Sequence, residues 1–165
     1  MWLLNKREVE GVNSAVIVCP TTLLNVWNTE VANIVKHFPE DFRCVLTVSV
    51  LISTTPRRER VVSHHRTCDY TYNVLITTYG LVTSTKSMSP SADDEDPHCY
   101  KYVVLDEGHR IKSPFTQMHK ACLNICSPGT HRLLLSGTPI QNNLLELHAL
   151  IAWCKGPELL GDAKR

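Results

Sequence analysis

The stretch "YVVLDEGHRIKS" at residues 102–113 decides the predicted fold. Its apolar run at 103–105 is typical of a buried strand, and the run ends in two adjacent acids, Asp106 and Glu107. A carboxylate at a strand tip can hold Mg²⁺ beside a nucleotide phosphate, usually through water. A neighbouring acid can orient or deprotonate the attacking water. An acid pair after an apolar strand is also common without any catalytic role. The surrounding sequence therefore has to discriminate between a catalytic and a non-catalytic pair.

Other apolar runs on both sides of this stretch predict a layered α/β fold. The runs predicted to be strands are 14–20, 43–50, 73–78, 102–106 and 131–138. The segments predicted to be helices are 23–35, 57–66, 115–126 and 142–154, and 87–99 is predicted to be a surface loop. Strands that alternate with helices indicate βαβ units and a parallel sheet. Since the strands are continuously apolar, both sheet faces are covered, which makes a three-layer α/β fold.

Polar residues at the predicted helix starts offer caps. Thr21 or Thr22 could cap the helix whose apolar positions recur at helical spacing from Leu23 to Val35. Thr55 with Pro56 could begin the helix at 57–66, and Thr78 could cap a short helix.

Length and composition restrict the class of protein. The 165 residues suffice for one domain with a real core, and 43% hydrophobic with 20% charged residues is typical of a globular chain. The net charge of +1 implies that any nucleic-acid contact is local. No apolar run approaches the ~18 residues of a membrane span, and the first ten residues do not resemble a signal peptide. Seven cysteines without a Cys-x-x-Cys pair indicate reduced thiols inside a cell.

The strand ends carry the candidate chemistry, because ligands of an open parallel sheet bind at the carboxyl ends of its strands. These ends are 19–22, 77–79, 106–109 and 136–139. Two of them are rich in hydroxyl groups and could offer helix N-terminal amides, which suit phosphate oxygens. The same hydroxyl groups could instead act only as helix caps.

Four stretches in this order carry a resemblance. They are "VIVCPTTLLNVW" (16–27), "VLITTYGLV" (74–82), "YVVLDEGHRIKS" (102–113) and "RLLLSGTPIQNNLLELHAL" (132–150). They resemble motifs Ia, Ib, II and III of the SWI/SNF-type ATPases of helicase superfamily two, over residues 14–155. The "DEGH" and "SGT" sequences differ from those of a DEAD-box RNA helicase. The stretch "CKGPELLG" (154–161) resembles the excision-repair-six-like subgroup, which includes the Cockayne B protein and the mitotic translocase PICH.

The resemblance implies a partial first RecA-like lobe of the P-loop NTPase type, which binds ATP and Mg²⁺ and moves along double-stranded DNA in the nucleus. In this reading Asp106 organises Mg²⁺ through water, Glu107 activates water and His109 connects the acids to motif III. ATP would lie near Asp106, Glu107, Gly137 and Thr138. The residues implied to couple nucleotide state to DNA are Ser136, Gly137, Thr138 and Gln141. The residues implied to lie near the DNA backbone are Thr21, Thr22, Thr77 and Thr78. Asn142 and Asn143 match positions that shape the lobe surface.

The sequence departs from the family in one respect. No glycine begins or ends a Walker A loop, G-x-x-x-x-G-K-[ST], which such ATPases need for the phosphates. The second RecA-like lobe, which supplies arginine fingers in this family, is not recognised either. Residues 1–165 are therefore expected to be a partial helicase ATP-binding domain, inactive alone and a fragment of a chromatin-remodelling or DNA-repair ATPase. The alternative is a catalytically dead module that binds DNA or protein.

Other polar groups have weaker functional readings. His119, Cys122 and Cys126 share one helical face and could hold zinc, but core packing is the favoured reading. The acidic run 93–96 lacks the spacing of a calcium loop. His64 and His65 are predicted to be an exposed pair on a basic helix. Four arginines of that helix could meet phosphate or form a solvated face: Arg57, Arg58, Arg60 and Arg66.

Overall fold

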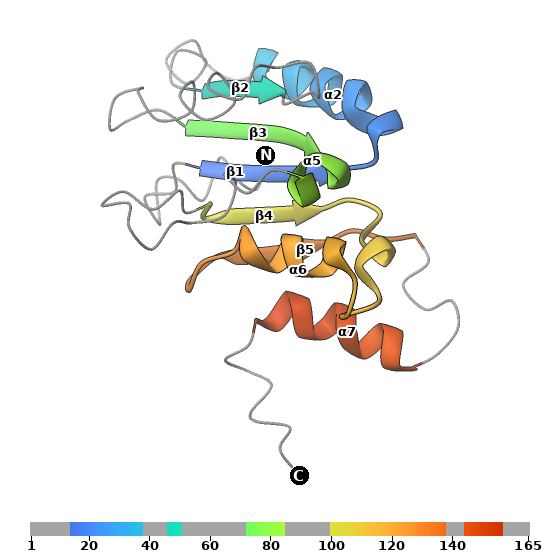
Figure 1. The fold of residues 1–165 in the computed structure, drawn as a ribbon. Helices are drawn as coiled ribbons and strands as arrows, with labels where there is room; N and C mark the ends of the chain where they lie inside the picture. The colour runs from blue at the N-terminus through green and yellow to red at the C-terminus, as the bar shows by residue number, and fades with distance from the viewer. Residues whose placement is uncertain (1–13, 38–45, 51–71, 85–99, 138–143, 157–165) are drawn as a thin grey trace.

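The computed structural model describes residues 14–37, 46–50, 72–84, 100–137 and 144–156. Its strands are β1 (Ser14–Cys19), β2 (Leu46–Val50), β3 (Tyr72–Thr78), β4 (Tyr102–Leu105) and β5 (His131–Leu134). Its α-helices are α2 (Leu24–Lys36), α5 (Tyr79–Ser84), α6 (Gln117–Asn124) and α7 (Leu144–Lys155). Two 3₁₀ turns, η1 (Thr21–Leu23) and η3 (Gly108–Ile111), follow β1 and β4. Figure 1 shows the order of these elements around the sheet.

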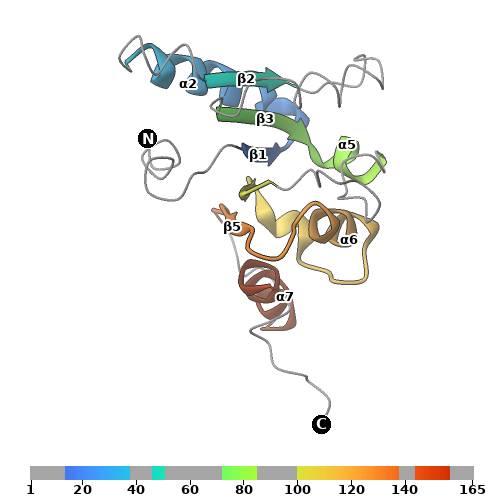
Figure 2. The same ribbon diagram turned by 90° about the vertical axis from the view of Figure 1, so that its left-hand side faces the viewer.

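The strands form one parallel sheet in the order β2-β3-β1-β4-β5, and Figure 2 shows them stacked between α2 and α7. Cys19 on β1 pairs with Thr78 on β3, and Val18 pairs with Leu105 on β4. Leu105 in turn pairs with Leu134 on β5. Because of this register, the carboxyl ends of β1, β3, β4 and β5 lie at one edge of the sheet. The predicted parallel sheet is confirmed.

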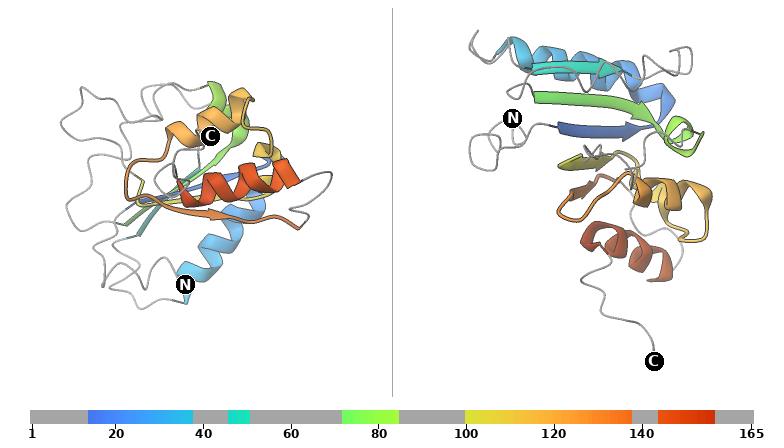
Figure 3. Two further views of the ribbon diagram at one scale, coloured as in Figure 1. Left: turned by 90° about the horizontal axis from the view of Figure 1, so that it is seen from below. Right: turned by 60° about the vertical axis from the view of Figure 1, so that its left-hand side comes forward.

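Helices lie on both faces of the sheet (Figure 3), and each face has its own apolar core. On one face α2 packs against alternate residues of β1, β3 and β4, among them Ile17, Ile76 and Val104. On the other face α5, α6 and α7 cover Val16, Leu105 and their neighbours. Strands buried on both faces need apolar residues at successive positions, which explains the uninterrupted runs in the sequence. The predicted three-layer arrangement is therefore confirmed.

Some predicted boundaries and caps were wrong. Neither Thr21 nor Thr22 caps α2, since Pro20 starts η1 and the α-helix follows from Leu24 without a side-chain cap. β5 ends at Leu134 rather than continuing to 138, and α6 begins after Thr116, whose hydroxyl accepts the His119 N–H. The Thr78 cap is confirmed by the Leu81 N–H, 3.3 Å from its hydroxyl oxygen.

Several predicted elements lie outside the described residues. They are the helix at 57–66 with its arginines and histidine pair, the loop at 87–99 with its acidic run, and the start of the strand at 43–50. Among the helices that the structure describes, none has both the length and the apolar character to cross a membrane.

Candidate active site

Asp106 is fixed at the tip of β4 through its main chain and its side chain. Its N–H donates to the carbonyl of Val18 on β1 (2.9 Å), and its carbonyl accepts the hydroxyl of Tyr79 on α5 (2.7 Å). Carboxylate oxygen Oδ2 accepts the indole N–H of Trp27 on α2 (2.7 Å), and Oδ1 accepts the N–H of Glu107 (2.9 Å). The Trp27 and Glu107 N–H groups thus orient the carboxylate, while β1 and α5 fix the main chain of Asp106.

Glu107 has an unusual backbone conformation. With φ 52° and ψ 46° it is in the left-handed region, and it is the one non-glycine residue with positive φ in the described part of the chain. This conformation costs a non-glycine residue about 1–2 kcal/mol. It turns the chain after Asp106 and leads directly into η3.

His109 joins Glu107 to the end of β5. Its Nδ1 lies 3.2 Å from Glu107 Oε2 and 3.4 Å from the hydroxyl oxygen of Ser136. The side chains of His109 and Glu107 are 28% and 41% exposed, so solvent reaches both. The structure therefore brings together Glu107, His109 and Ser136, although His109 and Ser136 are 27 residues apart in the sequence.

Gly108 allows this turn to dock on the end of β5. Its N–H donates to the carbonyl of Leu135 (2.8 Å). A β-carbon at Gly108 would approach Leu134 Cγ more closely than real β-carbon contacts allow. The glycine between Glu107 and His109 is thus required by a close approach of the main chain to a side chain.

The groups around Asp106 are held in their neutral forms. Burial raises the pKa of the Cys19 thiol to about 11, and the Asp106 charge adds to this shift. Burial also raises the pKa of Tyr79 well above its usual range, with smaller contributions from Cys122 and Asp106. At neutral pH Tyr79 therefore remains a hydrogen-bond donor to the Asp106 carbonyl, and Cys19 remains a thiol that donates to the Thr77 carbonyl at 3.6 Å.

The carboxylates suit Mg²⁺ better than a metal held entirely by protein. Asp106 and Glu107 offer oxygen ligands, and the described residues contain no group of three or more histidine, cysteine, aspartate or glutamate side chains that could hold a metal. Mg²⁺ keeps several waters and usually takes one or two carboxylates together with substrate phosphates. The donor set at this strand tip fits that mode of binding.

The predicted DNA-proximal threonines differ in exposure. Thr21 and Thr22 are exposed at the carboxyl end of β1. Thr77 is fully buried and Thr78 is 7% exposed, with its hydroxyl engaged in the cap of α5. The prediction that these four threonines lie near a DNA backbone stays open.

The remaining predicted site residues lie at the end of β5 or beyond it. Gly137 is exposed, two residues after Leu135, and Ser136 contacts His109 as described above. Thr138 and Gln141, with Asn142 and Asn143, lie outside the described residues. Their roles therefore stay predictions.

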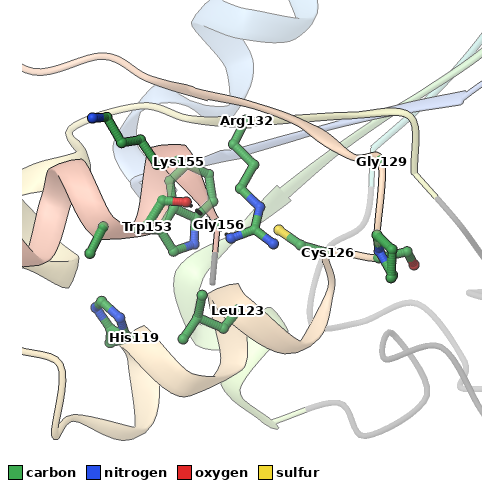
Figure 4. A pocket seen from close by; sticks show the side chains of 11 residues that line it. His119, Leu123, Cys126, Gly129, Arg132, Trp153, Lys155 and Gly156 are labelled. Atoms are coloured by element: carbon green, nitrogen blue, oxygen red, sulfur yellow. Dashed lines mark hydrogen bonds between the residues drawn. The ribbon is translucent and has the colours of Figure 1, made fainter. Parts of the chain in front are cut away.

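His119 and Cys122 are core residues, which is the favoured of the two readings of that helical face. His119 is 4% exposed with Nδ1 2.7 Å from the Ile111 carbonyl, and Cys122 is fully buried. The Cys126 thiol, two residues beyond the end of α6, donates to the Cys122 carbonyl. A cavity of about 420 Å³ opens beside α6, and its lining includes His119, Cys126, Arg132 and Trp153 (Figure 4). Asp106, Glu107 and His109 are not among the residues that line it.

Sequence reasoning missed two residues of the site. Trp27 was recognised only as an apolar position of a helix, and Tyr79 only as a residue at a strand end. Both donate hydrogen bonds to Asp106, at 2.7 Å each. An indole or phenol group on the apolar face of a helix is a weak signal, because buried tryptophan and tyrosine usually find some partner.

Comparison with known proteins identifies relatives of this chain. The chain is 38% identical over 92% of its length to Protein CHROMATIN REMODELING 24 of Arabidopsis thaliana, and it covers 13% of that protein. It is 38% identical over 86% of its length to DNA excision repair protein ERCC-6 of Mus musculus, and it covers 8% of that protein. The chain thus spans a small part of the curated relatives it matches.

The fold is shared with a solved structure, the Sulfolobus solfataricus SWI2/SNF2 ATPase core in complex with dsDNA. The TM-score is 0.64 at 21% identity, over 91% of this chain and 26% of that one. This likeness identifies the fold as RecA-like. The SNF2-related domain family matches residues 2–163, nearly the whole sequence. On these grounds the chain belongs to the SNF2-related domain family.

Proposed function

We propose that this chain is the first RecA-like lobe of an ATP-dependent DNA translocase that works in chromatin remodelling or DNA repair. The observation that carries the proposal is the pair of acids at the tip of β4. Asp106 is oriented by hydrogen bonds from α2 and α5, and Glu107 is held beside it in a strained conformation. Strained backbone at such a position is typical of functional sites.

In the proposed site, Asp106 holds Mg²⁺ through water, and the metal neutralises charge on the nucleotide phosphates. Glu107 accepts a proton from the attacking water. His109 restrains the Glu107 carboxylate through the contact at 3.2 Å. The same imidazole contacts Ser136, two residues after the end of β5, and so links Glu107 to that segment. Gly137 and Thr138, which follow directly, are proposed to lie near the nucleotide, and Gln141 to join them in coupling nucleotide state to DNA.

Glu107→Gln tests the role of the acid pair. The variant is placed in a protein that joins this lobe to a phosphate-binding loop and second lobe from a relative. Loss of one positioned acid–base group costs about 10²–10⁴-fold in turnover. Steady-state ATP hydrolysis should fall by that factor while nucleotide affinity is kept. Near wild-type turnover would refute the role of Glu107, and Glu146→Gln, which removes an acid paired with Lys112, is the matched control.

Double-stranded DNA is the proposed partner, bound through its backbone at Thr21 and Thr22, and the nucleus is the proposed location. The relatives whose names refer to chromatin remodelling and DNA excision repair support this proposal. The competing candidate is a module that has lost catalysis and only binds DNA or protein. The hydrogen bonds that orient the Asp106 carboxylate favour the enzyme, since a module that only binds DNA or protein does not need an oriented carboxylate.

A further inference from the structure

The indole of Trp27 contacts the carboxylate of Asp106 across 79 residues of sequence. Nε1 lies 2.7 Å from Oδ2, which is within the range of a charge-assisted hydrogen bond. An indole N–H can only donate, so the direction of this bond does not depend on a tautomer. The carboxylate is therefore the acceptor.

The bond determines how the carboxylate plane is turned. Rotation about the last torsion of an aspartate side chain is broad, so the side chain alone does not fix this plane. Here Oδ1 accepts the Glu107 N–H at 2.9 Å and Oδ2 accepts the Trp27 N–H at 2.7 Å. Each oxygen keeps a lone pair for another partner, such as a water bound to a metal. The Glu107 bond alone leaves the second oxygen without a restraint.

Trp27 is itself held in place. It is half-buried and packs with Leu23 and Val31 of the same helical segment against the core that includes Cys19 and Ile17. The indole N–H is thus in place before a metal binds, so the Trp27 side chain does not need to change its rotamer on binding. A purely space-filling tryptophan would keep this packing but would not need its N–H to reach Asp106.

We propose that Trp27 is a positioning residue for Asp106: its N–H holds the carboxylate in the orientation that binds a hydrated divalent cation. This inference rests on the proposed function, in which Asp106 organises Mg²⁺. Partners that orient a ligating carboxylate typically contribute 10–100-fold to metal affinity. Removal of the Trp27 indole N–H should therefore weaken cation binding without changing the fold.

The test measures Mn²⁺ binding to the full 165-residue chain by electron paramagnetic resonance, up to millimolar concentration. Trp27→Phe removes the donor and keeps most of the packing. Trp153→Phe is the matched control, because that indole is fully buried and donates to the Cys122 carbonyl at 3.2 Å, away from Asp106. Asp106→Asn reports whether binding depends on the carboxylate at all.

We expect Trp27→Phe to weaken Mn²⁺ binding about tenfold or more and Trp153→Phe to leave it unchanged. A second readout is the indole N–H resonance in nitrogen-15 spectra, where Mn²⁺ should broaden the Trp27 signal before the Trp153 signal. Binding that depends on Asp106 but survives Trp27→Phe would overturn this inference alone. Binding that is absent, or indifferent to Asp106→Asn, would overturn both the inference and the magnesium role in the proposed function.

Discussion

Gly108 and Leu134 meet so closely that a β-carbon on Gly108 would clash with Leu134 Cγ and stand 2.7 Å from Cδ2. The contact joins the turn after β4 to the last residue of β5, and the Gly108 N–H to Leu135 carbonyl bond closes beside it. The position of His109 relative to Ser136 depends on this junction.

Gly108→Ala should therefore destabilise the lobe by about 1–3 kcal/mol, the usual cost of overpacking. Urea unfolding of the wild type and the variant measures the difference. Leu134→Ala provides room for the new methyl group, so the cost of Gly108→Ala should shrink in that background. Strictly additive effects of the two substitutions would contradict the proposed clash.

Replacing Glu107 with a residue that adopts the left-handed conformation more readily should stabilise the fold. Asparagine tolerates the left-handed region better than glutamate. Glu107→Asn is expected to raise the free energy of unfolding by about 0.5–1 kcal/mol. Glu107→Gln removes the same charge without relieving the backbone, so it serves as the control and should change stability little. If both variants are equally stable, the strain at φ 52° is not stored in the folded state.

Residues 1–165 alone should bind Mg-ATP no more tightly than about 1 mM, which corresponds to about 4 kcal/mol. The reason is that the sequence contains no G-x-x-x-x-G-K-[ST] loop, whose amides and lysine hold the β- and γ-phosphates in P-loop enzymes. Calorimetry with Mg-ATP measures this. Micromolar affinity would show that other residues of the chain cradle the phosphates.

DNA binding by this chain should be weak, independent of sequence and sensitive to salt. Hydroxyl groups such as those of Thr21 and Thr22 contact phosphates without reading bases, and the net charge is only +1. Titration of duplexes of different sequence at low and high salt measures this. Replacing both threonines with alanine should weaken binding to every duplex alike. A strong preference for one sequence, or affinity kept at high salt, would be the contrary result.

The lobe should lose stability at alkaline pH. Burial raises the pKa of Cys19 to about 11 and that of Cys122 to about 12, and an unfolded cysteine titrates near 8.5. Because the folded pKa is the higher one, the protonated thiols stabilise the fold fully below about pH 8.5. This contribution declines as pH rises through about 11 to 12.

Thermal unfolding between pH 7 and pH 11, with a reducing agent present, checks this expectation. The midpoint should be level near neutral pH and fall above about pH 9. Cys19→Ala should flatten part of that fall. A midpoint that does not change with pH would contradict the burial of these thiols.

The class of fold was predictable because its signal is local. The strand at 102–106 differs by one residue from β4, and that at 73–78 differs by one residue from β3. Short, β-branched apolar runs favour strands covered on both faces, and their alternation with helices leaves few topologies other than a parallel sheet. The acids at the end of the run then have to lie at the ligand-binding edge.

Helix starts were less predictable, since several residues near a boundary can act as caps. Thr78 does cap α5, but Thr21 and Thr22 do not cap α2, because Pro20 begins a 3₁₀ turn in their place. The exposure of threonines at strand ends could not be predicted either. Thr77 and Thr21 have similar sequence contexts, yet the former is fully buried under the neighbouring elements.

The sequence by itself determined the order of the elements, the parallel sheet and the place of Asp106 and Glu107 at its carboxyl edge. Only the tertiary structure decided that Trp27 and Tyr79 donate to Asp106, and that Gly108 rests against Leu134. The physical reason is distance along the chain. Periodicity and turn chemistry act over a few residues, whereas these contacts depend on how α2, α5 and β5 pack around β4, which no local pattern encodes.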